Sequence, residues 1–276
     1  RRTARSVIRP HRRRVGRRAV LAACAALGIA VACADLGTGL DAVSYIAFDR
    51  IPYPALIAGD TMRDSLGAAA PLRASAFDAG GREITGAAFT YLTLDTGVTI
   101  DADGFLRATT RRDGTVRLVA SFNGLQTDDR TVRITRRPDS LLTSGATALS
   151  LSYVIPDVAA TNISPELRVS LVSRDTVGVG PAVGGWLVRW TTVHGTDTLG
   201  LTDTTLVALQ TANGARRSTD TTAADGSASR RLRVFANRLT VAVDSFVVLA
   251  DVRLHGVRVP GSPVRFVVRI APPAAP

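Results

Sequence analysis

The chain is 276 residues long and 46% hydrophobic, which is ordinary for folded proteins and excludes disorder along its whole length. At the usual size of about 100–200 residues per domain, this length predicts about two domains. The net charge of +11 would suggest a nucleic acid or an anionic surface as partner. However, residues 1–18 hold nine arginines and no acidic residue, so +11 minus +9 leaves only +2 for the other 258 residues. We therefore expect no nucleic-acid partner.

Residues 1–36 have the layout of an export leader. A basic stretch, residues 1–18, precedes an apolar run from Ala19 to Ala34 that ends in small residues, and this order is typical of a secretion signal. Arginines lie before the run and Asp35 and Asp41 lie after it, which places the N-terminus in the cytoplasm. We expect residues 1–18 to be a cytoplasmic arm and residues 19–36 to be an anchor or signal helix in the inner membrane. The remaining chain would then lie in the periplasm.

The only two cysteines, Cys24 and Cys33, lie inside the apolar run, so the rest of the chain has no disulfide and no cysteine-based metal site. Each cysteine ends a possible lipobox, "LAAC" and "AVAC". Five residues separate Arg18 from Cys24, which is too few for the apolar part of a signal, whereas fourteen precede Cys33 within the run. If the protein is an outer-membrane or cell-surface lipoprotein, Cys33 is its candidate lipidation site.

A retained helix is the third possibility, beside cleavage and lipidation. Sixteen apolar residues would span about 24 Å of a hydrocarbon core of roughly 30 Å, and snorkelling arginines could make up the difference. Small residues at helical spacing form a strip on which another membrane helix could pack: Ala22, Ala26, Ala30, Gly28 and Ala32. We favour retention, and the other two outcomes stay open.

From Val43 onward the sequence predicts short strands separated by turns. "VSYIAFD" alternates from residue 43 to 49, "PLRASAFDAGGREITGAAFTYLTLD" gives two strands around residues 79–82, and "VTIDADGFLRAT" is a hairpin turning at residues 101–104. In "GTVRLVASFNG", Val116, Leu118, Ala120 and Phe122 share one face before the turn at Asn123-Gly124. Strands at a spacing of about 8–12 residues, without helical periodicity, predict an all-β sandwich.

These segments resemble the bacterial Ig-like domain family, the small sandwiches repeated in invasin-type and intimin-type surface proteins. The residues that carry the resemblance are "PLRASAFDAGGREITGA", "VTIDADGFLRAT" and "GTVRLVASFNGLQTDDRTVRI". A tryptophan that the family places after the "ITGA" turn is replaced by "FTYL", with Phe89 and Tyr91. The resemblance implies a first Ig-like domain over residues 43–137.

A second unit follows a predicted linker, residues 138–146, in which Pro138, Ser144 and Gly145 suit a connection. In "ALSLSYVI" one face holds Leu149, Leu151, Tyr153 and Ile155. "DTTAADGSASRRLRVF" resembles late strands of the same family, and "GSPVRFVVRI" is the last predicted strand. We expect a second Ig-like domain over residues 147–270 and a tail over residues 271–276.

Two tryptophans of this second unit, Trp186 and Trp190, share a strand face with Val188. We expect Trp190 in the core and Trp186 only partly buried, because Gly184-Gly185 precedes it. A partner-binding role for Trp186 stays open.

The sequence shows no recognisable catalytic motif. His11, His194 and His255 are far apart, there are two glutamates, Glu83 and Glu166, and no phosphate-binding loop or nucleophile motif is present. "DADG" at residues 101–104 is interpreted as a hairpin turn rather than a calcium loop. We therefore expect no enzyme, cofactor or metal. Among several Arg-Arg pairs, Arg216-Arg217 is a candidate contact for an acidic partner.

The sequence thus predicts two tandem Ig-like β-sandwich domains behind one N-terminal hydrophobic helix. The favoured function is a non-catalytic, membrane-tethered accessory subunit that braces other protein subunits of a membrane complex. One alternative is a surface lipoprotein acting as adhesin or spacer. Another is a carbohydrate-binding accessory module, which would need surface aromatic residues in a chain with 5% aromatics.

Overall fold

The computed structural model describes residues 43–109, 113–155, 157, 161–174, 180–201, 206–240 and 242–273. The predicted arm and hydrophobic helix, including Cys33 and the strip Ala22, Ala26, Ala30, Gly28 and Ala32, lie outside these residues. Within the described ranges no helix has the length and apolarity needed to cross a bilayer.

The described chain is all-β, as predicted. Its strands are β1 (Tyr45–Arg50), β2 (Ala55–Ile57), β3 (Arg73–Phe77), β4 (Glu83–Ile84), β5 (Thr90–Thr93), β6 (Val98–Ile100), β7 (Leu106–Ala108), β8 (Gly114–Phe122), β9 (Leu125–Gln126), β10 (Arg130–Thr135), β11 (Ser140–Thr143), β12 (Ala148–Ser152), β13 (Leu167–Val172), β14 (Leu187–His194), β15 (Asp197–Leu199), β16 (Val207–Gln210), β17 (Thr219–Thr221), β18 (Ser227–Val234), β19 (Asp244–Asp251), β20 (Arg253–Leu254), β21 (Val257–Arg258) and β22 (Val264–Ala271). A single 3₁₀ turn, η1 (Ala236–Arg238), is the helical element among the described residues.

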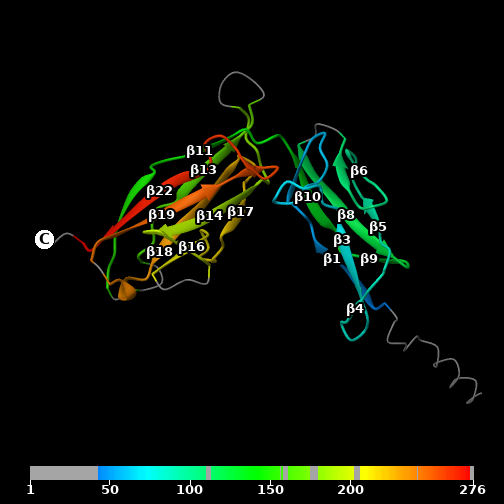
Figure 1. The fold of residues 1–276 in the computed structure, drawn as a ribbon, viewed down its shortest axis with the longest axis horizontal. Coiled ribbons are helices and arrows are strands. Elements are labelled where there is room, and N and C mark those ends of the chain that lie inside the picture. Colours follow the sequence, from blue (N-terminus) through cyan, green and yellow to red (C-terminus); the bar gives the residue numbers. More distant parts are fainter. Residues whose placement is uncertain are drawn as a thin grey trace, which may run out of the picture.

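Each sheet takes all its strands from one side of Pro138. In the first sandwich, β1–β10, a sheet of order β1-β3-β4 faces one of order β2-β10-β8-β5. In the second sandwich, β11–β22, a sheet of order β11-β13-β18-β16 faces one of order β12-β22-β19-β14-β15, to which β17 adds on β14. Figure 1 shows the two sandwiches at opposite ends of the long axis.

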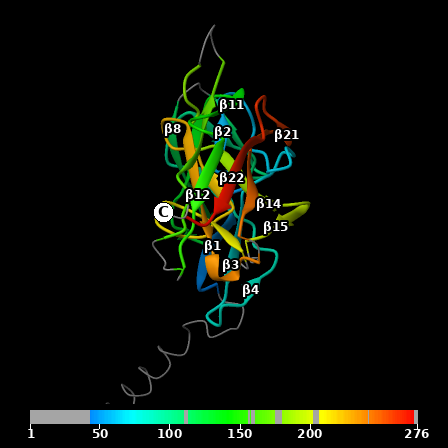
Figure 2. The ribbon, with the colours of Figure 1, turned by 90° about the vertical axis from the view of Figure 1, so that its left-hand side faces the viewer.

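The two sandwiches repeat one pattern of strand pairing. Each opens with a strand that pairs antiparallel in one sheet, β1 with β3 and β11 with β13. The next strand then joins the other sheet, parallel to its last strand: β2 pairs with β10. In the same way β12 pairs with β22, and Figure 2 shows these two strands side by side. Switching sheets at the first strand ties the two layers together and is consistent with an Ig-like sandwich.

The inner faces follow the alternation in the sequence. Val116, Leu118 and Ala120 of β8 are buried as predicted. The Asn123-Gly124 turn has positive φ at both residues (48° and 81°), as a type I′ hairpin turn requires. Ile155 is different: it is 67% exposed, although its spacing placed it with the buried Tyr153. The strand β12 ends at Ser152, so the alternation no longer holds there.

The predicted linker is in part a strand. Residues 140–143 form β11, and the connection between β10 and β11 is residues 136–139. The Asp139 backbone N–H donates to the Val172 carbonyl at 2.9 Å, and the Asp139 carboxylate accepts from the Arg174 backbone N–H at 2.8 Å. The chain is therefore fixed to the second sandwich almost as soon as it leaves the first. The predicted domain boundaries themselves stay predictions.

Candidate functional site

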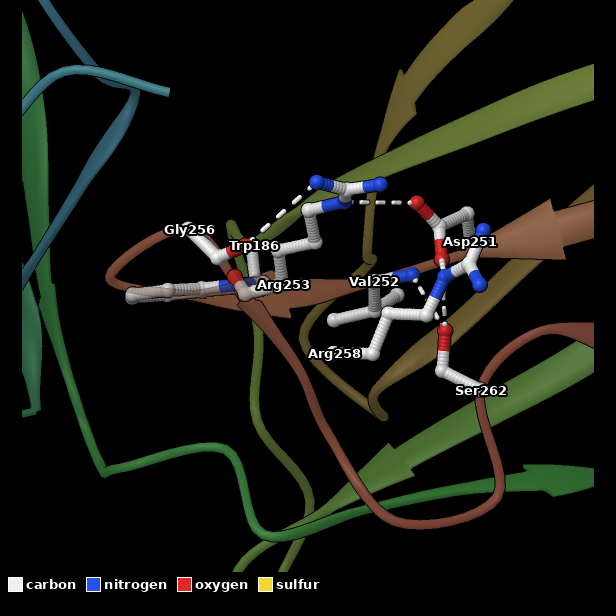
Figure 3. Close-up of polar contacts among 7 residues, drawn as sticks. All are labelled: Trp186, Asp251, Val252, Arg253, Gly256, Arg258 and Ser262. Carbon is white, nitrogen blue, oxygen red and sulfur yellow. Dashed lines mark hydrogen bonds and ion pairs between the residues drawn. The ribbon is translucent and has the colours of Figure 1, made fainter. Parts of the chain in front are cut away.

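The candidate site is the junction between the sandwiches, where Tyr53 meets Trp186. Tyr53 lies between β1 and β2, and Trp186 directly precedes β14. Their ring centroids are 4.9 Å apart at an interplanar angle of 54°, and the Trp186 indole N–H donates to the Arg253 carbonyl at 3.0 Å (Figure 3). Trp186 is only 4% exposed. The expectation that Trp186 is only partly buried was therefore wrong. Gly184 and Gly185 have no side chains to cover the ring, but Tyr53 of the first sandwich covers it.

Tyr53 is largely buried in this contact, with 8% of its surface exposed. Burial, the largest influence, raises the pKa of the Tyr53 hydroxyl well above its usual range, against the opposing influence of the Leu187 backbone and the Arg189 charge. A phenol surrounded by protein loses the water that would stabilise its anion. The ring therefore acts as an apolar contact with a polar tip, not as an acid or base at neutral pH.

A hairpin of the second sandwich, β20–β21, reaches onto the first sandwich through its tip. His255 and Gly256 form the turn with φ of 48° and 80°. The His255 Nε2 atom lies 2.7 Å from an Asp60 carboxylate oxygen, and Arg63 is 3.5 Å from the other oxygen of Asp60. The Arg63 guanidinium also donates to the Gly67 carbonyl at 3.0 Å, which fixes the loop that receives the hairpin.

Two glycines make this docking close. A Cβ added at Gly67 would lie 2.3 Å from the His255 carbonyl carbon, and one added at Gly256 would lie 2.2 Å from the Leu66 carbonyl oxygen. Both obstacles are backbone atoms, which cannot move aside as a flexible side chain would. Both glycines also have positive φ, 95° and 80°. The loop at Gly67 and the hairpin turn at Gly256 therefore pack backbone against backbone, at a distance that only glycine permits.

Asp251, at the end of β19, holds the hairpin in place from the other side. Its carboxylate accepts hydrogen bonds from Arg253 Nε at 2.9 Å, Arg258 Nε at 2.8 Å and Ser262 Oγ at 3.0 Å (Figure 3). The Ser262 hydroxyl in turn accepts from the Val252 backbone N–H at 2.9 Å. Burial alone would raise the pKa of Asp251, but these hydrogen bonds outweigh it and lower the pKa below its usual value.

A third contact across the junction comes from Arg133 of β10, whose side chain lies against Gly184 and Gly185. A Cβ at Gly185 would be 2.7 Å from the Arg133 Cδ atom. The Arg133 guanidinium donates to the Asp113 carboxylate at 3.1 Å, so its position is set within the first sandwich. The glycines before Trp186 thus make room for an arginine of the other sandwich.

Beside these contacts lies an open cleft with a volume of about 390 Å³, lined by Arg50, Ile51, Pro52, Tyr53, Pro54, Ser65, Leu187, Arg189, Trp190, Thr191, Ser218 and Thr219. Its polar lining consists of hydroxyls and guanidiniums. Among the described residues no three metal-binding side chains gather at one point. His194 pairs with Asp244 at 2.8 Å and stacks on Phe246, so it forms a cross-strand contact between β14 and β19.

The sequence-predicted contact residues belong to two places. Trp186 lies in the junction, whereas Arg216 and Arg217 lie in the segment between β16 and β17. The Arg216 guanidinium carbon is 5.6 Å from the centre of the Phe235 ring, and the Arg217 carbonyl accepts from Arg230 Nε at 3.0 Å. Sequence reasoning missed Tyr53, Asp60, Asp251 and His255. The one local signal was His255-Gly256 between short apolar runs, which suits a tight turn.

Comparisons with known proteins add no identity. No protein-family model matches the chain, and no curated protein sequence matches it. Among solved structures it is similar to the S-layer protein SbsC domains 4 and 5, with 13% identity, coverage of 83% of this chain and 98% of that chain, and a TM-score of 0.29. It is also similar to the Yersinia pseudotuberculosis adhesin InvE, with 15% identity, coverage of 85% and 61%, and a TM-score of 0.32. For Drosophila N-cadherin EC1-4 the values are 12%, 82% and 50%, and 0.29. These similarities are too low to support an argument, and it is the strand pairing that defines the sandwiches.

Proposed function

We propose that the protein is a non-catalytic structural protein whose two sandwiches act as one rigid extracytoplasmic unit, tethered to the inner membrane by residues 19–36. The interlocked junction carries this proposal. Sandwiches in one chain usually move relative to one another unless their interface is large and apolar. Here the connection is residues 136–139, and Tyr53 and Trp186 are both buried. The backbones at Gly67 and Gly256 pack so closely against the opposite loop that neither position has room for a Cβ atom.

A rigid unit suits a protein whose role is to hold other subunits in place and not to catalyse a reaction. A brace between subunits of a membrane complex must hold its two ends at a fixed separation, which a flexible pair of sandwiches would not do. The arginine-rich arm and the apolar run supply the proposed tether. The partners would be other protein subunits of that complex.

A surface lipoprotein that projects as a spacer would use the same rigid unit. Lipidation at Cys33 would distinguish this alternative from a protein held by a retained membrane helix. A carbohydrate-binding module would need exposed aromatic rings, and neither tryptophan supplies one. Trp186 and Trp190 are both buried, whereas Tyr45, stacked on Phe77 with ring centroids 4.8 Å apart, is 49% exposed.

The rigidity is testable by pulsed electron spin resonance on the full chain. Spin labels on ketone-bearing residues replacing Asp129 and Thr196 report the distance between the sandwiches without using the native cysteines. We expect one narrow distance distribution for the wild-type chain. Gly256→Ala should broaden it, because the new Cβ would overlap the Leu66 carbonyl oxygen.

Gly59→Ala is the matched control for this experiment. Gly59 also has a positive φ, 86°, but a Cβ there meets nothing within 4 Å. It should therefore introduce similar backbone strain and leave the distance distribution narrow. A broad distribution in the wild-type chain would refute the rigid unit.

A further inference from the structure

Three arginines converge on one aromatic ring at the end of β18. The guanidinium carbon of Arg233 lies 5.0 Å from the Phe235 ring centroid, that of Arg238 lies 5.4 Å away and that of Arg216 lies 5.6 Å away. All three distances are within the range of a cation–π interaction. The three side chains come from β18, from η1 and from the segment before β17, so the fold brings them together from separate parts of the sequence.

This arginine cluster (Arg216, Arg233 and Arg238 around Phe235) concentrates like charges. Each guanidinium carbon is within 5.6 Å of the same point, so the three charges repel one another at distances within about one Debye length. Arg233 is compensated by Asp157 at 3.5 Å. Arg216 is exposed and has no ion pair among the described residues. The ring's negative face offsets part of the repulsion but supplies no full negative charge.

The surface beside the cluster already binds carboxylates. On β18, Arg231 is two residues from Arg233 and donates to the Glu166 carboxylate at 2.9 Å. The Nε atoms of Arg231 and Arg233 are buried without a hydrogen-bond partner. These buried Nε atoms are out of reach of an outside ligand, so an incoming carboxylate would bind the exposed guanidinium of Arg216 beside them.

We propose that the arginine cluster is a docking site for an acidic segment of a partner polypeptide. A guanidinium over an aromatic ring loses little freedom when it binds, and it offers paired N–H donors that match a carboxylate. Carboxylates on one extended segment would pair with Arg216 and contact the neighbouring guanidiniums at the same time. The proposal goes beyond the structural role argued above, because it names a surface and a class of partner and does not depend on the junction.

Residue-resolved arginine footprinting of the full chain tests the proposal. The chain contains no lysine and 34 arginines, so its exposed arginines are the residues that react with p-hydroxyphenylglyoxal, and mass spectrometry reads each of them. The probe is a deca-glutamate peptide. We expect saturating peptide to slow modification of Arg216 and Arg238 at least fivefold. Arg265 and Arg269, exposed on β22, should change less than twofold.

Variants of the chain show whether the peptide binds the arranged arginine cluster or responds only to the net positive charge. Phe235→Leu keeps every charge and an apolar side chain but removes the ring, and it should abolish most of the protection at Arg216 and Arg238. Arg265→Gln with Arg269→Gln removes the same number of charges as Arg216→Gln with Arg238→Gln. The β22 pair should leave binding unchanged within twofold, whereas the cluster pair should weaken it at least tenfold. Circular dichroism of each variant checks that it is folded.

Three outcomes would overturn the proposal. One is equal protection of Arg265 and Arg269, which would mean unspecific attraction. Another is the absence of protection at Arg216 and Arg238. The third is protection at lower concentrations of heparin or of phosphatidylglycerol vesicles than of deca-glutamate, because the site would then bind a sulfated polysaccharide or a lipid surface. None of these depends on how rigid the junction is.

Discussion

At the scale of single residues, the two tryptophans show when alternation along a strand predicts burial and when it does not. Alternation with Leu187 and Arg189 correctly predicted that Trp190 faces the core, where it is 2% exposed and lies 6.3 Å from the Phe266 ring. The same alternation could not reveal that Tyr53, more than a hundred positions earlier, covers Trp186. Alternation describes one strand and its own sheet, whereas burial of Trp186 is decided by the other sandwich.

Trp190→Ala should lower the free energy of unfolding by about 3–5 kcal/mol, the usual range for a buried aromatic side chain truncated in a core. Urea denaturation followed by circular dichroism measures this loss. Val257→Ala is the control, because Val257 is 71% exposed and should change stability by only about 0.5 kcal/mol or less. An unchanged midpoint for Trp190→Ala would mean that the ring is not part of the core.

At the scale of elements, long alternating strands were predictable and short or uniformly buried ones were not. The strands β1, β18 and β22 each alternate between buried and more exposed residues over five or more positions. Other elements lack that signal. All four residues of β16 are buried, so it has no alternation, and β11 is flanked by the proline and glycine that predicted a linker. Such strands are set by the neighbours that they pair with.

The β20–β21 hairpin carries a prediction about acid stability. The pKa of Asp251 is lowered in the folded protein, so its ionised form stabilises the fold at pH above its unfolded value of about 3.9. That contribution is lost as the pH falls through the lowered folded pKa. We expect Asp251→Asn to remove this part of the acid dependence, measured by urea denaturation at a series of pH values. At neutral pH it should also increase hydrogen exchange at residues 252–259.

Asp225→Asn is the control for the hairpin. The pKa of Asp225 is also lowered, through hydrogen bonds from Ser227, but Asp225 lies in the turn before β18. Its replacement should change the acid dependence while leaving exchange at residues 252–259 as in the wild-type chain. Equal exchange there in Asp251→Asn and wild type would show that the Asp251 hydrogen bonds do not hold the hairpin.

At the scale of the whole molecule, the sequence predicted the sandwiches but not their junction. The pairs that build it, Asp60 with His255 and Tyr53 with Trp186, join residues far apart in the chain. Neither a lone histidine nor a glycine in a turn indicates its distant partner. The junction follows from the shapes of two finished sandwiches, and periodicity within either one contains no information about it.

The proposed tether carries the last prediction. Nine arginines in residues 1–18 resist transfer across a bilayer, and the apolar run that follows can be held with its arginines at the cytoplasmic surface. Intact mass spectrometry of protein purified from membranes should therefore show Arg12 to Arg18 still attached. Cys33→Ser should leave the membrane-bound fraction unchanged, as should Cys24→Ser. A mature form that begins at a diacylated Cys33, and that Cys33→Ser releases from the membrane, would replace the retained helix with the lipoprotein.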